Sequence, residues 1–334
     1  MELTAKVKKT LNMGLRVAVA LFSLWFIYRQ VFYTGDYQWF EYDFPQLLRQ
    51  SSFLKNFLPA LLLMPVNWGL EGLKWRMLAM HVRDLSYGEA LRSVLTGISF
   101  SLFTPNRVGD SLGRIFSLRI SDPLNAVLLA VAGSLAQIIA TCFFGSLAFL
   151  FYIRRFIGFH ESWQLFFFAG LVIIVIIINM LMLMLFLRAQ GVSAGFHKMI
   201  KPGWRKIHGY ISVLQGVRRI VLVKVILLSF LRYLVFSFQF YLMLRAFSIH
   251  IPLPAAFVLI AMTYLVMTTI PTIALADLGI RGSVAIYFIG AYFVPSVHAS
   301  AGILMATALI WIINLAVPAL AGLLFIGRLT IFRK

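Results

Sequence analysis

The sequence predicts an all-α, polytopic integral membrane protein with about six full spans and two re-entrant half-helix hairpins in an inverted internal repeat. Hydrophobic residues make up 61% of the 334 residues and charged residues only 12%, which is more apolar than a soluble core requires. Several apolar segments reach the roughly 18 to 20 residues that a bilayer-spanning helix needs. The same order of elements also occurs twice. We therefore expect one transmembrane domain over residues 1–334.

Six segments have the length and hydropathy of full spans. The first begins like a signal peptide, basic and then apolar, but no small-x-small cleavage site follows it. We therefore expect an uncleaved first span with its N-terminus in the cytoplasm. The predicted spans are 13–33, 53–75, 124–152, 164–187, 222–247 and 298–327.

Two further apolar stretches, 87–104 and 254–275, have a different character. Each runs into a proline and a polar patch that contains glycine. A short second helix then follows, at 107–119 and 279–294. This order is typical of a re-entrant hairpin, which enters the membrane, breaks and returns to the same side.

The distribution of basic residues tests this topology. When neither hairpin crosses the membrane, most of the 30 Lys and Arg residues fall on one side, with the pair Arg154 and Arg155 as the main exception. The bias predicts an inner-membrane protein with both termini in the cytoplasm. The net charge of +19 then favours anionic inner-leaflet lipids as partners. We expect no nucleic-acid partner, because the basic residues lie in short loops between apolar runs.

The longest basic segment, 188–221, allows two interpretations. Apolar residues recur at helical spacing from Phe196 to Leu214, with Lys and Arg at the other positions. This pattern indicates a cytoplasmic amphipathic helix on the inner membrane face. An ordinary solvated basic loop is the alternative.

A weak internal repeat relates the two hairpins. A shift of 166 residues places Pro105 on Pro271 and aligns the order of elements in a first repeat, about 53–152, with that in a second, about 222–327. Three crossings separate the starts of the repeats, so their orientations are opposite. Broken helices in inverted repeats that meet near the bilayer midplane are a recurrent architecture of transporters.

The break of the first hairpin contains the first candidate site. Its backbone, freed at Pro105 and Gly109, cannot face lipid, because unsatisfied amides cost several kcal/mol there. It must line a protein-buried or wet cavity, where Arg107 and Arg114 offer cationic donors for an anion such as phosphate. Asp110 would orient one arginine or bind a cationic headgroup. Alternatively, the two arginines are ordinary charges of the inner membrane face.

The second hairpin and the fifth span contain the remaining candidates. Asp277 and Arg281 are four residues apart and can pair on one helical face, as a site or as a structural ion pair. Arg232 lies in the middle of a span, where an arginine is functional by default. Its expected partner is Glu71 or a lipid phosphate; a purely structural pair with Glu71 is the alternative. The expected hinges of the two hairpins are Pro105, Gly109, Pro271 and Gly279.

No sequence motif indicates a cofactor or a metal. The six histidines show no ligand spacing, Cys142 is the single cysteine, and no P-loop, HExxH or nucleophile elbow is present. We expect no catalytic residues, no metal and no cofactor. Transport would then be downhill, or coupled to an ion or to the membrane potential through a carboxylate such as Glu71, Asp110 or Asp277.

Three segments resemble the lysylphosphatidylglycerol synthase transmembrane region family, which is also called flippase-like or UPF0104. They are "NWGLEGLKWRMLA" (67–79), "GISFSLFTPNRVGDSLGR" (97–114) and "TTIPTIALADLGIRGSV" (268–284). The middle segment resembles the family's P-x-R-x-G-E-x-x-R motif, with Asp110 in place of glutamate and Arg114 one residue beyond the motif's last arginine. The last segment departs further, because it lacks the family's double glycine and has Gly282 at the acidic position.

The resemblance implies translocation of a lipid across the bilayer. Its best-described members flip aminoacylated phosphatidylglycerol, and others occur with enzymes of lipid or glycan assembly. The matching positions are Pro105, Arg107, Gly109, Asp110 and Arg114 in the middle motif, and Pro271, Gly279 and Arg281 in the last. The chain ends at Lys334 without a soluble aminoacyl-transfer domain, so we expect it not to synthesise aminoacyl lipid itself.

The sequence therefore predicts an inner-membrane protein that translocates an anionic or aminoacylated phospholipid, or a lipid-linked precursor. A lipid-modifying enzyme is a further expected partner. Two alternatives stay open. One is an intramembrane transferase acting on a lipid phosphate, with Asp110 or Asp277 as the base. The other is a non-transporting scaffold for an envelope-lipid enzyme.

Overall fold

The computed structural model describes residues 50–102, 104, 108–118, 122–156, 162–188, 216–270, 274–293 and 297–325. All regular secondary structure in these ranges is helical. The helices are α3 (Ser51–Ala79), α4 (Tyr87–Ser101), α5 (Val108–Leu118), α6 (Pro123–Phe156), α7 (Ser162–Leu187), α10 (Arg219–Ala246), α11 (Leu253–Thr269), α12 (Ala274–Gly290), α13 (Val297–Trp311), the π-helix η3 (Ile312–Ala316) and α14 (Val317–Leu323).

Several predictions fall outside this part of the chain. The first predicted span, 13–33, is among them, as is nearly all of the basic segment 188–221. So are Pro105, Arg107 and Pro271, and the side chain of Asp277.

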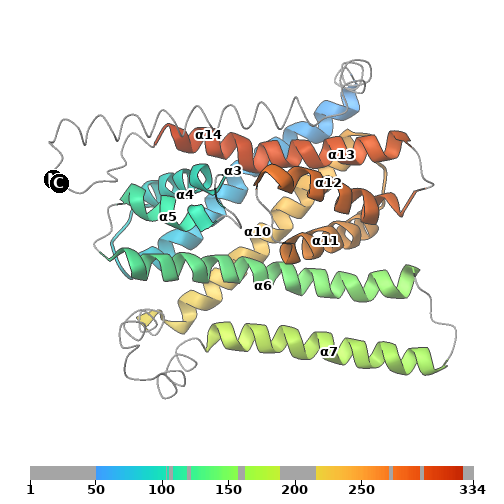
Figure 1. Ribbon diagram of the computed structural model, residues 1–334, viewed down its shortest axis with the longest axis horizontal. Helices are drawn as coiled ribbons and strands as arrows, with labels where there is room; N and C mark the ends of the chain where they lie inside the picture. Colours follow the sequence, from blue (N-terminus) through green and yellow to red (C-terminus); the bar gives the residue numbers. More distant parts are fainter. Residues whose placement is uncertain are drawn as a thin grey trace.

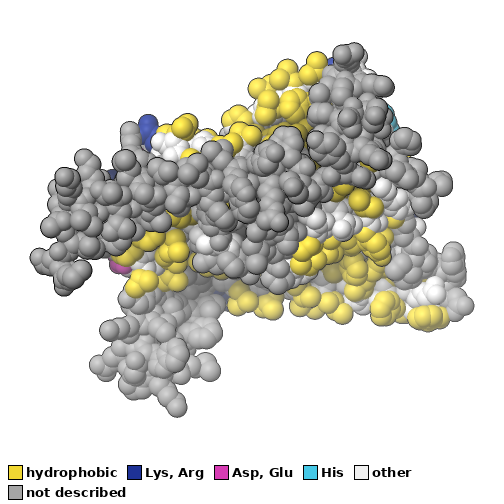
Figure 2. All heavy atoms as spheres, turned by 45° about the horizontal axis from the view of Figure 1, so that its top comes forward, with side chains coloured by type: hydrophobic (Ala, Val, Ile, Leu, Met, Phe, Trp, Pro, Cys, Tyr) yellow, Lys and Arg dark blue, Asp and Glu magenta, His cyan; other side chains and the backbone are white. Residues whose placement is uncertain are grey.

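Within the described residues, four helical stretches are long and apolar enough to cross a membrane. They are Pro123–Arg155 in α6, Trp163–Leu187 in α7, Arg219–Ala246 in α10 and Ala299–Leu323 across α13, η3 and α14. The most apolar of them, α7, is also the least covered by other helices. Figure 2 shows hydrophobic side chains over large parts of the described surface, and those of Phe166, Ile177 and Met180 on α7 are more than half exposed. Such a helix is stable in contact with lipid tails.

The helices α3 and α10 pack along each other through the centre of the molecule (Figure 1). They are antiparallel. Phe53 meets Phe247 near one end, with 5.7 Å between ring centres. Further along, the buried Gln239 Nε2 donates to the main-chain oxygen of Ala60 at 2.8 Å. At 29 residues α3 is about 44 Å long, and its last third carries Glu71, Lys74 and Arg76.

Each helix of the first hairpin, α4–α5, is shorter than the hydrocarbon core of a bilayer. Its helices have 15 and 11 residues, or about 22 Å and 17 Å, against a hydrocarbon core of about 30 Å. Ser86 starts α4 with a capping box to Glu89. The two helices contact each other closely because Gly97 faces Gly113. A hydrogen bond of 2.7 Å from the Gly109 N–H to Thr104 Oγ1 then holds the start of α5.

The second hairpin, α11–α12, lies beside the opposite end of α6 from α4–α5 (Figure 1). Its helices begin at residues 253 and 274, and those of the first hairpin at 87 and 108, so both pairs keep the predicted 166-residue interval. One boundary was wrong. The sequence predicted the second helix from 279, but it begins at Ala274, and Gly279 lies inside it with open space around its Cα. The break comes earlier because Ile270, the residue before a proline, is extended.

The last span closes the bundle over the first hairpin. Ser99 Oγ on α4 donates to the main-chain oxygen of Ala319 on α14 at 2.6 Å. Gly322 allows this approach, since a Cβ there would overlap the main chain of Leu95. Between α13 and α14, the π-helix η3 widens one turn and carries Asn314. The first hairpin is thereby packed between α3 and the last span.

Candidate functional site

The centre of the site is a carboxylate on α3. Glu71 and Lys74 are three residues apart, so they share one helical face, and Lys74 Nζ lies 2.7 Å from Glu71 Oε2. Their side chains are 5% and 2% exposed. Burial of two charges is costly unless they are paired, and here each is the other's neighbour.

The first hairpin contributes a second cation to the same carboxylate. Arg114 on α5 places Nη1 3.0 Å from Glu71 Oε1. Its Nε and Nη2 donate to the two oxygens of Asp110, one turn earlier, at 3.0 and 2.5 Å. This bidentate geometry fixes the guanidinium plane. Gly97 makes room for the pair, because a Cβ there would overlap both Asp110 and Arg114. Asp110 thus pairs with an arginine, which is the contact that the first of its two predicted roles requires.

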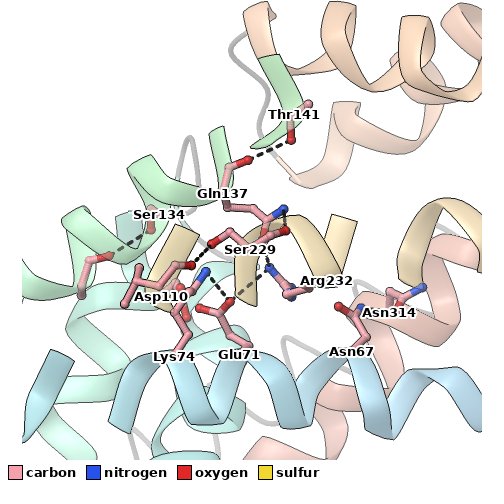
Figure 3. Close-up of polar contacts among 12 residues, drawn as sticks. Asn67, Glu71, Lys74, Asp110, Ser134, Gln137, Thr141, Ser229, Arg232 and Asn314 are labelled. Atoms are coloured by element: carbon pink, nitrogen blue, oxygen red, sulfur yellow. Dashed lines mark hydrogen bonds and ion pairs between the residues drawn. The ribbon is translucent and has the colours of Figure 1, made fainter. Parts of the chain in front are cut away.

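A third cation comes from the middle of α10. Arg232 Nη1 lies 3.2 Å from Glu71 Oε2 and also donates to Gln137 Oε1 on α6 at 3.2 Å. Its guanidinium carbon is 5.0 Å from the ring centre of Trp68 on α3, a cation–π distance. Figure 3 shows Glu71 and Arg232 facing each other between their helices, with Gln137 above them. The predicted contact of Arg232 with Glu71 is thus present.

We call these five residues, Glu71, Lys74, Asp110, Arg114 and Arg232, the charge cluster. Three cations face two carboxylates, which leaves one positive charge in excess. The cluster joins the hairpin helix α5 to the long helices α3 and α10. Its most accessible side chains are those of Asp110 and Arg232, at 19% and 15% exposed, while the others are at most 6% exposed. A ligand would therefore approach from the side of Asp110 and Arg232.

A second polar contact lies one turn along α3. Asn67 is 2% exposed, and its Nδ2 donates to Oδ1 of Asn314 on the π-helix at 2.8 Å. Figure 3 shows this amide pair on the same side of α3 as Glu71. It joins the last span to the helix that carries the charge cluster.

The structure brings together only some of the predicted site residues. Glu71, Asp110, Arg114 and Arg232 meet in the charge cluster. Arg281 is half-buried on α12, in the second hairpin. Among the described residues, no group of three His, Cys, Asp or Glu side chains is placed to hold a metal ion.

Four polar residues of the site, Asn67, Lys74, Gln137 and Asn314, were not predicted. Lys74 lies near the end of a predicted span, where a lysine usually reaches the membrane interface. Its spacing of three residues from Glu71 was the available signal. Gln137 and Asn314 were missed because each is a single polar residue in an apolar run, and its partner lies 95 or 247 residues away in the sequence.

Comparison with known proteins gives one assignment. No curated protein and no solved structure shows significant similarity to this chain. A family described as "Lysylphosphatidylglycerol synthase TM region" matches residues 14–322, nearly the whole length. The match spans every described helix except the last residue of α14. The chain therefore belongs to the lysylphosphatidylglycerol synthase transmembrane region family.

Proposed function

We propose that this protein translocates an anionic or aminoacylated phospholipid, or a lipid-linked precursor, across the inner cell membrane. The observation that carries the proposal is the charge cluster. Charged side chains at membrane depth are costly and mark substrate or ion pathways. A buried site with one positive charge in excess attracts an anion, and arginine suits the oxygens of a phosphodiester. The family assignment supports the membrane context and the lipid class.

The position of the charge cluster suggests how translocation would proceed. Arg114 lies on the short hairpin, whereas Glu71 and Arg232 lie on long helices. A small movement of α5 would exchange the contact between Arg114 and Glu71 for one with a lipid headgroup. The acyl chains would stay in the surrounding lipid. Arg107, Asp277 and Arg281 would extend the path toward the two hairpin breaks, with Glu71 as the coupling carboxylate.

The proposal includes orientation and partners. Both termini would lie in the cytoplasm, where the basic residues would contact anionic inner-leaflet lipids. A lipid-modifying enzyme would supply the substrate.

Reconstitution of the purified protein into liposomes tests the function. We expect scrambling of fluorescent phosphatidylglycerol, measured as the fraction that dithionite bleaches from outside. Arg232→Ala and Arg107→Ala should each lower the rate about tenfold, the effect of losing roughly 1.4 kcal/mol of binding. Arg245→Ala, on the same helix as Arg232 but bonded to Tyr241, is the matched control and should retain the wild-type rate.

Two results would contradict the proposal. Covalent change of the lipid without scrambling would indicate a transferase. The absence of both activities, together with a co-purifying enzyme, would indicate a scaffold.

A further inference from the structure

Two buried hydrogen-bond donors beside the charge cluster have no acceptor among the described residues. One is the indole Nε1–H of Trp68, whose residue is 8% exposed. The other is the Nε–H of Arg232. The 5.0 Å between the guanidinium carbon and the indole ring centre makes them neighbours. An unsatisfied buried donor costs about 1–3 kcal/mol, so two of them on neighbouring side chains indicate a site for an acceptor.

The contacts of Arg232 leave one edge of its guanidinium for this site. Its Nη1 is occupied by Glu71 and Gln137. The edge that contains Nε is therefore the one that these contacts leave unused. Arginine binds phosphate with two parallel N–H groups from such an edge.

Trp75, two turns further along α3, behaves differently. Its Nε1 donates to Ser93 Oγ at 2.8 Å, and both residues are buried. The indole of Trp75 is thus fully satisfied by the fold. Among the described residues Trp68 has no such partner, so its N–H is available for recognition.

We propose that Trp68 Nε1–H and Arg232 Nε–H donate together to the oxygens of one phosphodiester, so that Trp68 is a specificity-determining residue of the site. Two donors side by side exclude a cation. The excess positive charge of the cluster favours a monoanion over a neutral acceptor such as water. This inference rests on the proposed function, from which it takes the class of the ligand. A phospholipid headgroup and a free phosphate ion share this chemistry.

Calorimetric titration of the full-length protein in detergent tests the inference. The probes are dioctanoyl phosphatidylglycerol, inorganic phosphate and the neutral dioctanoylglycerol. We expect Trp68→Phe, which keeps the ring and removes only the N–H, to weaken phosphatidylglycerol binding about tenfold. Arg232→Lys, which keeps the charge and removes Nε–H, should act similarly. The double variant should lose less than the product of the two effects, because both donors bind one group.

Trp75→Phe is the matched control. It removes an indole N–H that bonds to Ser93, so it should lower the melting temperature and leave phosphatidylglycerol affinity unchanged. Dioctanoylglycerol should not bind. Competition by inorganic phosphate would identify the phosphate group alone as sufficient, and its absence would identify the lipid headgroup as the source.

The inference fails if Trp68→Phe folds and binds phosphatidylglycerol as tightly as wild type, or if Trp75→Phe weakens binding equally. Its failure is distinguishable from that of the proposed function. Binding that depends on Trp68 without any scrambling would contradict translocation only. If the wild-type protein scrambles lipid but Trp68→Phe leaves the lipid affinity unchanged, only this inference is contradicted.

Discussion

At the scale of single residues, Glu71 is the group on which the buried ion pairs converge. Its two oxygens contact Lys74, Arg114 and Arg232 within 3.2 Å. The sequence predicted Arg232 as an intramembrane arginine with Glu71 as a partner, because both stand out against apolar neighbours. The meeting with Arg114 could not be derived, since 43 residues separate the two and no local pattern encodes how α5 lies on α3.

Removal of this carboxylate should destabilise the protein strongly. In Glu71→Gln, three cations would face a neutral amide, and breaking a buried pair in this way costs about 3–5 kcal/mol. We expect a clearly lower melting temperature of the detergent-purified protein. Asp84→Asn removes the same charge from an exposed position between α3 and α4, so it should melt like the wild type. If Glu71→Gln and Asp84→Asn have the same melting temperature, the charge cluster does not stabilise the fold.

At the scale of elements, the first hairpin depends on glycines where helices touch. The sequence predicted both hairpins, because a proline and a glycine interrupt stretches too short to span. The sequence-based prediction placed the break of the second hairpin too late. The apolar run continues past the proline, so hydropathy does not mark the end of the helix. The close contact of Gly97 with α5 was also not predictable, because small residues are common in membrane helices for several reasons.

A methyl group at residue 97 should loosen this hairpin. Gly97→Ala would push its Cβ into Asp110 and Arg114, and overpacking of this kind costs about 1–3 kcal/mol. We expect reduced thermal stability and slower lipid scrambling. Gly88→Ala, on the same helix, meets nothing within 4 Å and should be neutral or stabilising by up to about 1 kcal/mol. The packing argument fails if the two variants have the same melting temperature.

At the scale of the whole molecule, the two hairpins approach from opposite ends of the long helices (Figure 1). The opposite orientation of the two repeats in the membrane stays a prediction. The apolar lengths were enough to predict an all-helical membrane protein with shorter broken helices, because membrane solvation restricts the possible topologies. They were not enough to predict which side chains meet at the centre. That depends on the rotation of each helix about its own axis, which hydropathy specifies poorly in helices that are apolar on all sides, such as α7.

Accessibility labelling should place the two ends of α3 and α10 on opposite sides of the membrane. In a Cys142→Ala background, a cysteine at Asp84 should react with an impermeant maleimide only from the cytoplasmic side. A cysteine at His250 should react only from outside. Both residues are exposed, at opposite ends of the bundle. Reaction of both from the same side would require a hairpin to cross the bilayer fully.

The uneven count of charges in the cluster has an electrical consequence. A pocket that holds one spare positive charge becomes neutral when a phosphodiester monoanion occupies it. Any rearrangement of the loaded protein would then move almost no charge through the field, whereas the return of the empty protein would move about one elementary charge, or about 2.3 kcal/mol per 100 mV if it crossed the whole field. The membrane voltage would therefore act on the resetting half of the cycle and leave the lipid-carrying half nearly untouched.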